Sequence, residues 1–144
     1  MLLQNIIKQH ELDHSVHDGL IKNTMNSTEI SKNIMTIAYN AYYKIPCCKS
    51  KNGFIEGDID LLQLLYSHKQ YKEIFGYTEV PFADSTLLLY EMKSSDTVCN
   101  YKKAIKQLTK SKNMIRDFTD YYKIDCFYVF NIDNSFVVRF EQVD

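Results

Sequence analysis

The sequence predicts a single domain of the α/β (α+β) class, in which a mixed central β-sheet is flanked by helices. Apolar residues recur at spacings of three and four over 1–25, 26–45 and 96–122, which is the pattern of a buried helix face. Two short and nearly continuous apolar runs, 59–66 and 86–92, have the length of buried strands. The chain has 144 residues, a length at which one hydrophobic core is the rule.

The first half of the chain is expected to contribute two helices. Residues 1–25 form an N-terminal helical extension, and the core of the domain then spans 26–144. Asn26 and Glu29 have the spacing of a capping box, so the second helix is expected to begin at Asn26. Pro46 requires this helix to end before it.

The second half is expected to alternate strands with one long helix. The expected elements are, in order, a strand at 59–66, a loop at 67–85, a strand at 86–92, a helix at 96–122 and strands at 126–132 and 136–140. The segment Asp133-Asn134-Ser135 has the composition of a tight hairpin turn between the last two strands.

The formal net charge of −1 is not that of a generally basic nucleic-acid-binding protein. A polyanion would therefore have to bind through a local patch or through bound metal ions. No run approaches the roughly 18 to 20 apolar residues that span a bilayer, and the N-terminus does not resemble a secretory signal. We therefore expect no membrane partner and an intracellular location, in the cytoplasm or the nucleus.

The cysteines and the residue usage agree with this location. No C-x-x-C pair is present among Cys47, Cys48, Cys99 and Cys126. Adjacent cysteines rarely bond to one another, so reduced thiols are expected. The richness in Lys, Asn, Ile and Tyr is typical of an AT-rich genome, which suggests a virus-encoded protein in a host cell as one source.

Charged residues interrupt the two central strands, where a buried strand should have none. Asp58 and Asp60 lead into the first apolar run, and Glu91 and Lys93 end the second. Side chains alternate along a strand, so Glu91 and Lys93 share one face, roughly 6 to 7 Å apart along the backbone. Asp58 and Asp60 share a face for the same reason. If the two strands are neighbours, Asp60, Glu91 and Lys93 can converge.

Such a group has a use in phosphodiester hydrolysis. Two carboxylates supply the hard oxygen ligands that Mg²⁺ or Mn²⁺ prefers. The metal ion can bind a phosphate oxygen and lower the pKa of a bound water, and a nearby lysine can orient that water. The structural alternative is that the acids cap a turn at a strand start, while Glu91 and Lys93 form a solvent-facing pair on an edge strand.

At these residues the sequence resembles the PD-(D/E)xK nuclease superfamily. The segment GDIDL at 57–61 is similar to the G-E-I-D-L that often supplies the first metal-binding acid, and EMK at 91–93 matches the E-x-K element. The resemblance implies the restriction-endonuclease-like core of Holliday-junction resolvases and RecB-like nucleases, with elements in the order αβββαββ. It also implies a metal-dependent nuclease, with DNA favoured over RNA as the substrate.

The resemblance further implies a role for each residue of the central group. Asp60 and Glu91 would be metal ligands, and the main-chain carbonyl of Met92 would be a third ligand. Lys93 would be the catalytic lysine. The cofactor would be Mg²⁺ or Mn²⁺.

Three more residues occupy auxiliary positions of the same pattern. Glu29 lies on the expected preceding helix, where many members offer another acid for the metal. Gln107 lies on the expected following helix, where many members carry a glutamine, although Ser111 stands where RecB-like members have a tyrosine. Asp58 is an auxiliary metal ligand in one interpretation and a turn residue in the other.

The helix that follows E-x-K is rich in lysine. Lys103, Lys106 and Lys110 recur at spacings of three and four, so they share one helix face. This stripe could contact nucleic-acid phosphates, and a merely solvated face is the alternative interpretation.

Three N-terminal histidines suggest two further metal roles. His10 and His14 have the i, i+4 spacing of zinc ligands on a helix, although nothing completes a tetrahedral site. His17 could correspond to the N-terminal histidine ligand of viral cap-snatching endonucleases, an RNA-cutting branch of the same superfamily. A polar helix face explains the three residues as well.

Two other functions therefore stand beside that of a DNA nuclease. One is an RNA endonuclease of the cap-snatching type, and the other is a catalytically inactive nucleic-acid-binding module on the same fold. A homodimer is also feasible, because cutting both strands of a duplex often needs two sites.

Overall fold

The structure is a computed structural model, and it describes residues 3–10, 18–31, 33–66, 85–131 and 138–143. In chain order its elements are α1 (Leu3–Ile6), β1 (Ile7–Gln9), α2 (Asp18–Thr28), β2 (Ile34–Pro46), β3 (Phe54–Leu65), β4 (Thr86–Lys93), α4 (Val98–Phe118), β5 (Ile124–Asn131) and β6 (Val138–Val143). The strands form one sheet in the order β1-β2-β3-β4-β5-β6. Among the strands that the structure describes, only β4 and β5, which α4 connects, are parallel neighbours.

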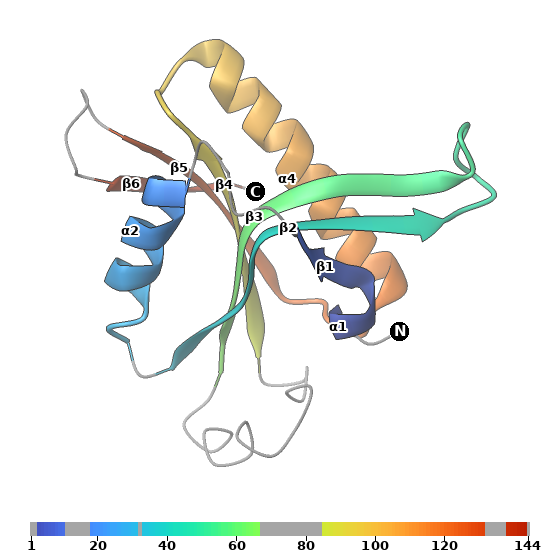
Figure 1. The fold of residues 1–144 in the computed structure, drawn as a ribbon, viewed down its shortest axis with the longest axis horizontal. Helices are drawn as coiled ribbons and strands as arrows, with labels where there is room; N and C mark the ends of the chain where they lie inside the picture. The colour runs from blue at the N-terminus through green and yellow to red at the C-terminus, as the bar shows by residue number, and fades with distance from the viewer. Residues whose placement is uncertain (1–2, 11–17, 32, 67–84, 132–137, 144) are drawn as a thin grey trace.

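Helices cover both faces of this sheet (Figure 1). Along β4, Leu87 and Leu89 pack in the cluster that includes residues of α1 and α4. Leu88, Tyr90 and Met92 pack in the cluster that includes residues of α2. Both faces of the strand are buried, which explains why its sequence is continuously apolar rather than alternating. The expected class, a mixed sheet flanked by helices, is confirmed.

The helix expected over 26–45 is wrong, because residues 34–46 form strand β2. Buried Ala41, Tyr43 and Ile45 alternate there with exposed residues, which is the two-residue period of a strand. The apolar spacing further upstream also fits a helix, but continuous pairing with β3 decides the outcome.

The expected boundary between two helices at residues 25 and 26 is also wrong. Helix α2 begins at Asp18 and ends at Thr28, so Asn26 lies inside its last turn and does not cap a new helix. The expected helical extension over 1–25 also contains β1, which pairs with residues 41–43 of β2. This part of the chain adds an edge strand to the sheet.

The second half agrees with expectation at β4, α4 and β5, with boundaries shifted by a few residues. Thr97 caps α4 by accepting a hydrogen bond from the amide of Asn100. Strand β6 is described over Val138–Val143, and residues 136–137 of the expected strand lie outside the described residues. Most of the expected loop at 67–85 and the turn at 133–135 lie outside the described residues.

Two findings bear on the membrane and disulfide expectations. None of the helices that the structure describes is long and apolar enough to cross a membrane. Cys47, Cys48, Cys99 and Cys126 are all free thiols, as expected.

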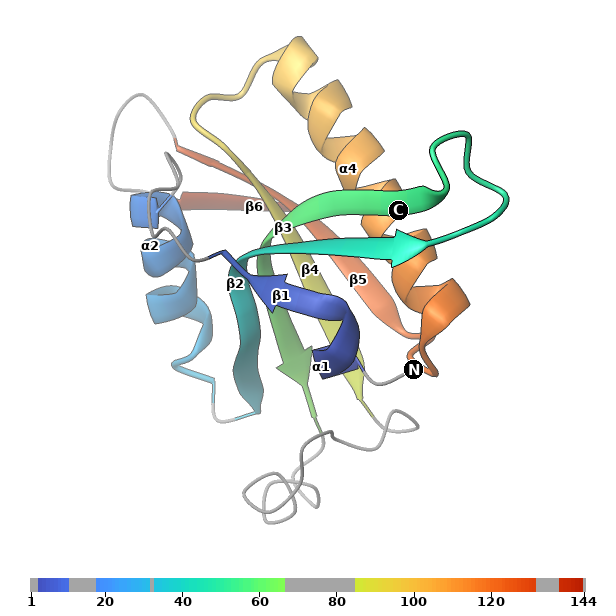
Figure 2. The same cartoon turned by 45° about the vertical axis from the view of Figure 1, so that its right-hand side comes forward.

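The hairpin of β2 and β3 extends beyond the rest of the sheet. Strands β2 and β3 remain paired out to Pro46 and Phe54, whereas the pairing of β3 with β4 begins at Leu65 and stops at Leu61. Beyond that point the hairpin bends away from β4 and crosses over α4 (Figures 1 and 2). We call residues 41–59 the hairpin arm.

The bend lies at Asp60. Ile59 and Leu62 belong to the same buried cluster, although strict alternation would place them on opposite faces. Opposite Asp60, between the pairs Tyr39–Leu61 and Ala41–Ile59, Asn40 adopts the left-handed conformation with φ of 46°. Asparagine is one of the few residues that tolerate this conformation, so the sequence permits the turn of the strand here.

Candidate active site

Asp60 and Glu91 meet where β3 and β4 separate. The last described pair of these antiparallel strands is Leu61 with Tyr90, and the next step along the same register joins Asp60 to Glu91. Because β3 turns away there, the amide of Met92 has no β3 carbonyl to bind. It donates instead to Oδ2 of Asp60, at 2.8 Å. The carboxyl groups of Asp60 and Glu91 also share a side-chain hydrogen bond.

Lys93 completes the group from the same strand. It lies two residues after Glu91, so both side chains leave β4 on the face that α4 covers. Its Nζ is 3.6 Å from Oε1 of Glu91 and donates to Oε1 of Gln107 at 3.4 Å. Gln107 projects from the middle of α4. The structure therefore brings together Asp60, Glu91, Lys93 and Gln107, four residues that the sequence singled out.

Burial raises the pKa of Glu91. The residue is 6% exposed, and the fully buried ring of Tyr128 lies beside it in register on β5. Burial, followed by the nearby charge of Asp60, raises the pKa of Glu91 to about 9, while the charge of Lys93 acts in the opposite direction. At neutral pH and without a cation, Glu91 therefore holds a proton.

This donor set suits a divalent cation. Two carboxylates at hydrogen-bonding distance, one of them buried, are costly unless a proton or a metal ion lies between them. Their oxygen atoms are the ligands that Mg²⁺ and Mn²⁺ prefer. Within the described residues no cluster of three or more His, Cys, Asp or Glu side chains could hold a metal. The protein would thus supply two acids, and Mg²⁺ commonly keeps several waters as its other ligands.

The expected third ligand, the Met92 carbonyl, stays a prediction. What the structure shows for Met92 is its amide on Asp60 and its side chain on the opposite face of the sheet, near Thr24 of α2. The amide contact fixes the Asp60 carboxylate against the backbone of the strand that carries Glu91.

The structure does not bring Glu29 to this group. The Glu29 carboxylate accepts a hydrogen bond from Thr36, and Gln63 links Thr36 to the hydroxyl of Tyr90. Tyr90 packs on the α2 side of the sheet, and its neighbour Glu91 points to the other side. Glu29 therefore belongs to a polar network on the face opposite Asp60.

Asp58 is likewise held elsewhere. Its carboxylate lies on the exposed surface of the arm and pairs with Nε2 of His10 at 3.1 Å. His10 lies just after strand β1 and not on a helix, so the i, i+4 zinc geometry expected for His10 and His14 does not apply. His14 and His17 lie outside the described residues.

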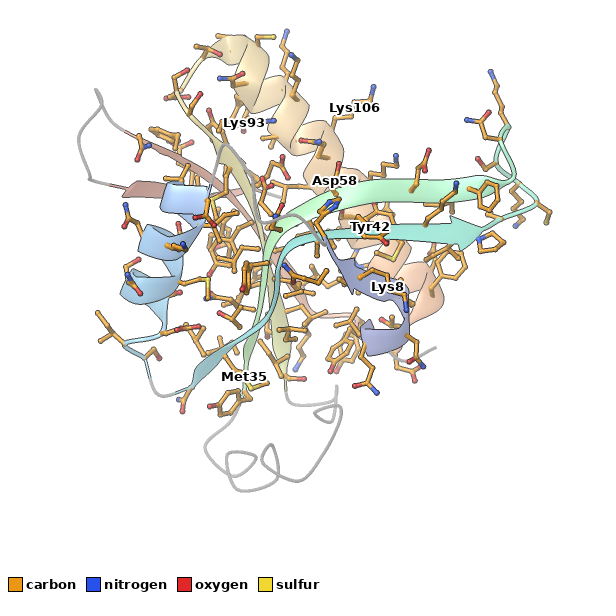
Figure 3. All side chains as sticks on the ribbon, viewed as in Figure 1. Lys8, Met35, Tyr42, Asp58, Lys93 and Lys106 are labelled. Atoms are coloured by element: carbon orange, nitrogen blue, oxygen red, sulfur yellow. The ribbon has the colours of Figure 1, made fainter. Side chains whose placement is uncertain are left out.

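The lysine stripe lies beside the group on α4. Lys103, Lys106 and Lys110 are exposed, whereas Gln107 between them is partly buried. Lys103 and Lys110 are four residues before and three residues after Gln107, so they flank it on one side of the helix. Lys106 extends from α4 into solvent above the arm (Figure 3). Contact of these lysines with phosphate stays a prediction.

Sequence reasoning missed the residues that hold the arm to α4. The Tyr43 hydroxyl is 3.1 Å from Oγ of Ser111, one turn after Gln107. The Tyr43 ring covers the Cα of Gly57, its cross-strand partner, so closely that a Cβ would overlap it. A glycine inside a strand often marks such a close approach, and the glycine of the GDIDL segment was therefore an available signal.

Comparisons of the chain with protein-family models, with curated proteins and with solved structures found no match.

Proposed function

We propose that the protein is a metal-dependent nuclease that hydrolyses phosphodiester bonds in nucleic acid, with Asp60 and Glu91 as its metal ligands. The observation that carries this proposal is the convergence of the two carboxylates and Lys93 at the fork between β3 and β4. An acid pair with one buried member and an adjacent cation is costly to fold, which argues for a function rather than a contribution to stability.

The protein residues have distinct tasks in this mechanism. A Mg²⁺ or Mn²⁺ ion bound by Asp60 and Glu91 would supply Lewis-acid activation of the phosphate and of a water nucleophile. Lys93 orients that water and offsets charge on the phosphate. Gln107 accepts a hydrogen bond from Lys93, and this contact holds the ammonium group near Glu91. Asp60 is fixed in turn by the Met92 amide.

The order of the elements supports the same proposal. From α2 onward the described elements are one helix, three strands, one helix and two strands, and this succession supports the αβββαββ order expected of the PD-(D/E)xK core. The acid strand and the E-x-K strand are neighbours, and α4 covers the face on which Glu91 and Lys93 lie. These are the relationships that the resemblance implies for a nuclease of this superfamily.

The test is a cleavage assay with Mn²⁺ on matched DNA and RNA substrates that are single-stranded, duplex and branched. The wild-type protein is expected to cut at least one of them, and D60N, E91Q and K93A are expected to lose about 10²- to 10³-fold in rate. Glu56→Gln is the matched control, because it neutralises an exposed acid on the same strand, four residues before Asp60.

The outcome also separates the alternative functions. Cutting of RNA alone would identify an RNA endonuclease. Binding of nucleic acid without any cutting or Mn²⁺ binding would identify an inactive binding module and contradict the proposal.

A further inference from the structure

Beside the acid pair, the outer surface of β1, β2 and β3 carries an exposed aromatic group. Tyr42 is 38% exposed, and its ring packs against the ring of His10, with 4.8 Å between centroids and 37° between planes. The nuclease mechanism above uses neither residue. We call Tyr42 and His10 together the aromatic platform.

Two contacts fix His10, and with it the platform, in place. The His10 amide donates to the carbonyl of Asn40 at 3.2 Å, and Nε2 of His10 contacts Asp58 at 3.1 Å. Tyr42 is the cross-strand partner of Asp58, so the residue that holds His10 lies opposite Tyr42. A surface aromatic residue held in this way loses little conformational entropy when a flat ligand stacks on it.

The platform is linked to the candidate active site through Asn40. The His10 amide binds Asn40, and Asn40 lies opposite Asp60 at the bend of the hairpin. Tyr42 and Asp58 lie on the arm below Lys93 and Lys106 in the view of Figure 3. A base that neighbours a phosphate at the acid pair would then lie along the arm that carries Tyr42.

The charges around the platform favour one nucleotide rather than a long duplex. Lys8 is the cross-strand partner of Tyr42, and Lys44 follows Tyr42 by two residues on the same exposed surface. Asp58 and Glu56 lie on that surface too, so its formal charge is balanced. A balanced surface does not attract a continuous double-stranded backbone, whereas an exposed ring with a nearby lysine suits an unpaired base and its phosphate.

We propose that Tyr42, supported by His10, stacks an unpaired base next to the phosphate bound at Asp60, Glu91 and Lys93. The inference rests on the proposed nuclease function. It adds a substrate class, because a base can reach the platform only from a single strand or from a duplex that is open at the site. Lys8 then contacts a phosphate of the same strand.

The experiment measures binding without cleavage. Fluorescence anisotropy with Ca²⁺ in place of Mn²⁺, a hard cation with the same preference for carboxylate oxygens, compares a labelled oligodeoxythymidine with a fully paired duplex that carries the same label. Tyr42→Ala is expected to weaken binding of the single strand roughly 5- to 150-fold, the range for loss of one stacked base. Tyr42→Phe, which keeps the ring, is expected to bind as the wild type does. Phe54→Ala is the control, because Phe54 is an exposed aromatic near the tip of the same arm.

Each outcome decides between the two proposals. Equal binding by wild type and Tyr42→Ala, or no binding of the single strand, would overturn the platform, and Mn²⁺-dependent cleavage would still support the nuclease. Tyr42-dependent binding of the single strand with no cleavage under any condition would support the platform and contradict the nuclease. If Phe54→Ala lowers the affinity for the single strand as much as Tyr42→Ala does, the platform is also overturned, because the effect is not local to Tyr42.

Discussion

Asp60 and Glu91 occupy the first position at which β3 and β4 no longer pair, and their carboxyl groups share a hydrogen bond there. The separation of β3 from β4 after Leu61 and Tyr90 explains how two acids from separate strands reach one point in a folded protein. Strand β3 turns away from β4 at this point. The Met92 amide of β4 then donates a hydrogen bond to the Asp60 carboxylate. The same geometry makes the metal-free protein sensitive to pH, to cations and to the backbone at the bend.

The first prediction concerns stability in the absence of metal. The pKa of Glu91 is about 9 in the folded protein and near 4.5 in the unfolded chain, so the folded state holds the extra proton between these values. The stability that this proton confers is complete below about pH 4.5 and is lost as the pH rises toward 9. Melting temperatures measured in EDTA should therefore fall across this window. Glu91→Gln, which stays neutral, should reduce the fall, and an unchanged slope in this variant would contradict the assignment.

The second prediction concerns proton release on metal binding. Because a cation at the acid pair replaces the proton on Glu91, Mn²⁺ affinity should rise with pH below about 9. Calorimetric titrations in two buffers of different ionisation enthalpy should show release of about one proton per ion at pH 7. A pH-independent affinity would indicate that Mn²⁺ binds elsewhere.

The third prediction separates Lys93 from Gln107. Lys93→Ala removes the cation beside Glu91 and should lower the cleavage rate about 10²- to 10³-fold. Gln107→Ala removes only the hydrogen bond that holds Lys93, so it should cost clearly less. Single-turnover rates at saturating Mn²⁺ give this order, and a Gln107→Ala loss equal to that of Lys93→Ala would give Gln107 a direct role.

The fourth prediction tests the contact between Tyr43 and Gly57. A Cβ at position 57 would overlap the Tyr43 ring and hydroxyl, and Ser111 restricts movement of that hydroxyl. Gly57→Ala should therefore lower the free energy of unfolding by about 1–3 kcal/mol, the usual cost of overpacking. In a double-mutant cycle with Tyr43→Leu, most of this cost should disappear. Additive effects of the two substitutions would contradict the contact.

The fifth prediction tests the bend at Asn40. A β-branched residue in the left-handed region costs about 1–2 kcal/mol, whereas glycine adopts it freely. Asn40→Val should lower the melting temperature and weaken Mn²⁺ binding, because Asp60 lies opposite Asn40 at the bend. Asn40→Gly should preserve Mn²⁺ binding. Equal behaviour of the two variants would separate the Asn40 backbone from the metal site.

The strands and helix that carry the central group could be predicted because their signals are local. Strand β4 is apolar on both faces up to Tyr90, and the three-and-four spacing of α4 continues over 21 residues. Charged residues are rare in a buried strand unless they are paired or functional, and this rule singled out Glu91 and Lys93. The convergence with Asp60 followed from the assumption that the two strands are neighbours, which the sheet order bears out.

The remaining errors arise where local patterns are ambiguous. Ile34, Ile37 and Ala41 are spaced as on a helix, yet pairing with β3 makes this segment a strand. The capping-box pattern of Asn26 and Glu29 predicts the start of a helix, but here it occurs where α2 ends. The bend at Asn40 depends on contacts between strands and leaves no short-range signal in the sequence.

The most direct test of the central claim is the position of Mn²⁺ in crystals of the wild-type protein, located by its anomalous scattering. We expect an ion in contact with carboxylate oxygens of both Asp60 and Glu91, and no ion at that position in Asp60→Asn. An ion bound elsewhere at saturating Mn²⁺, with Asp60 and Glu91 still hydrogen-bonded to each other, would contradict the claim.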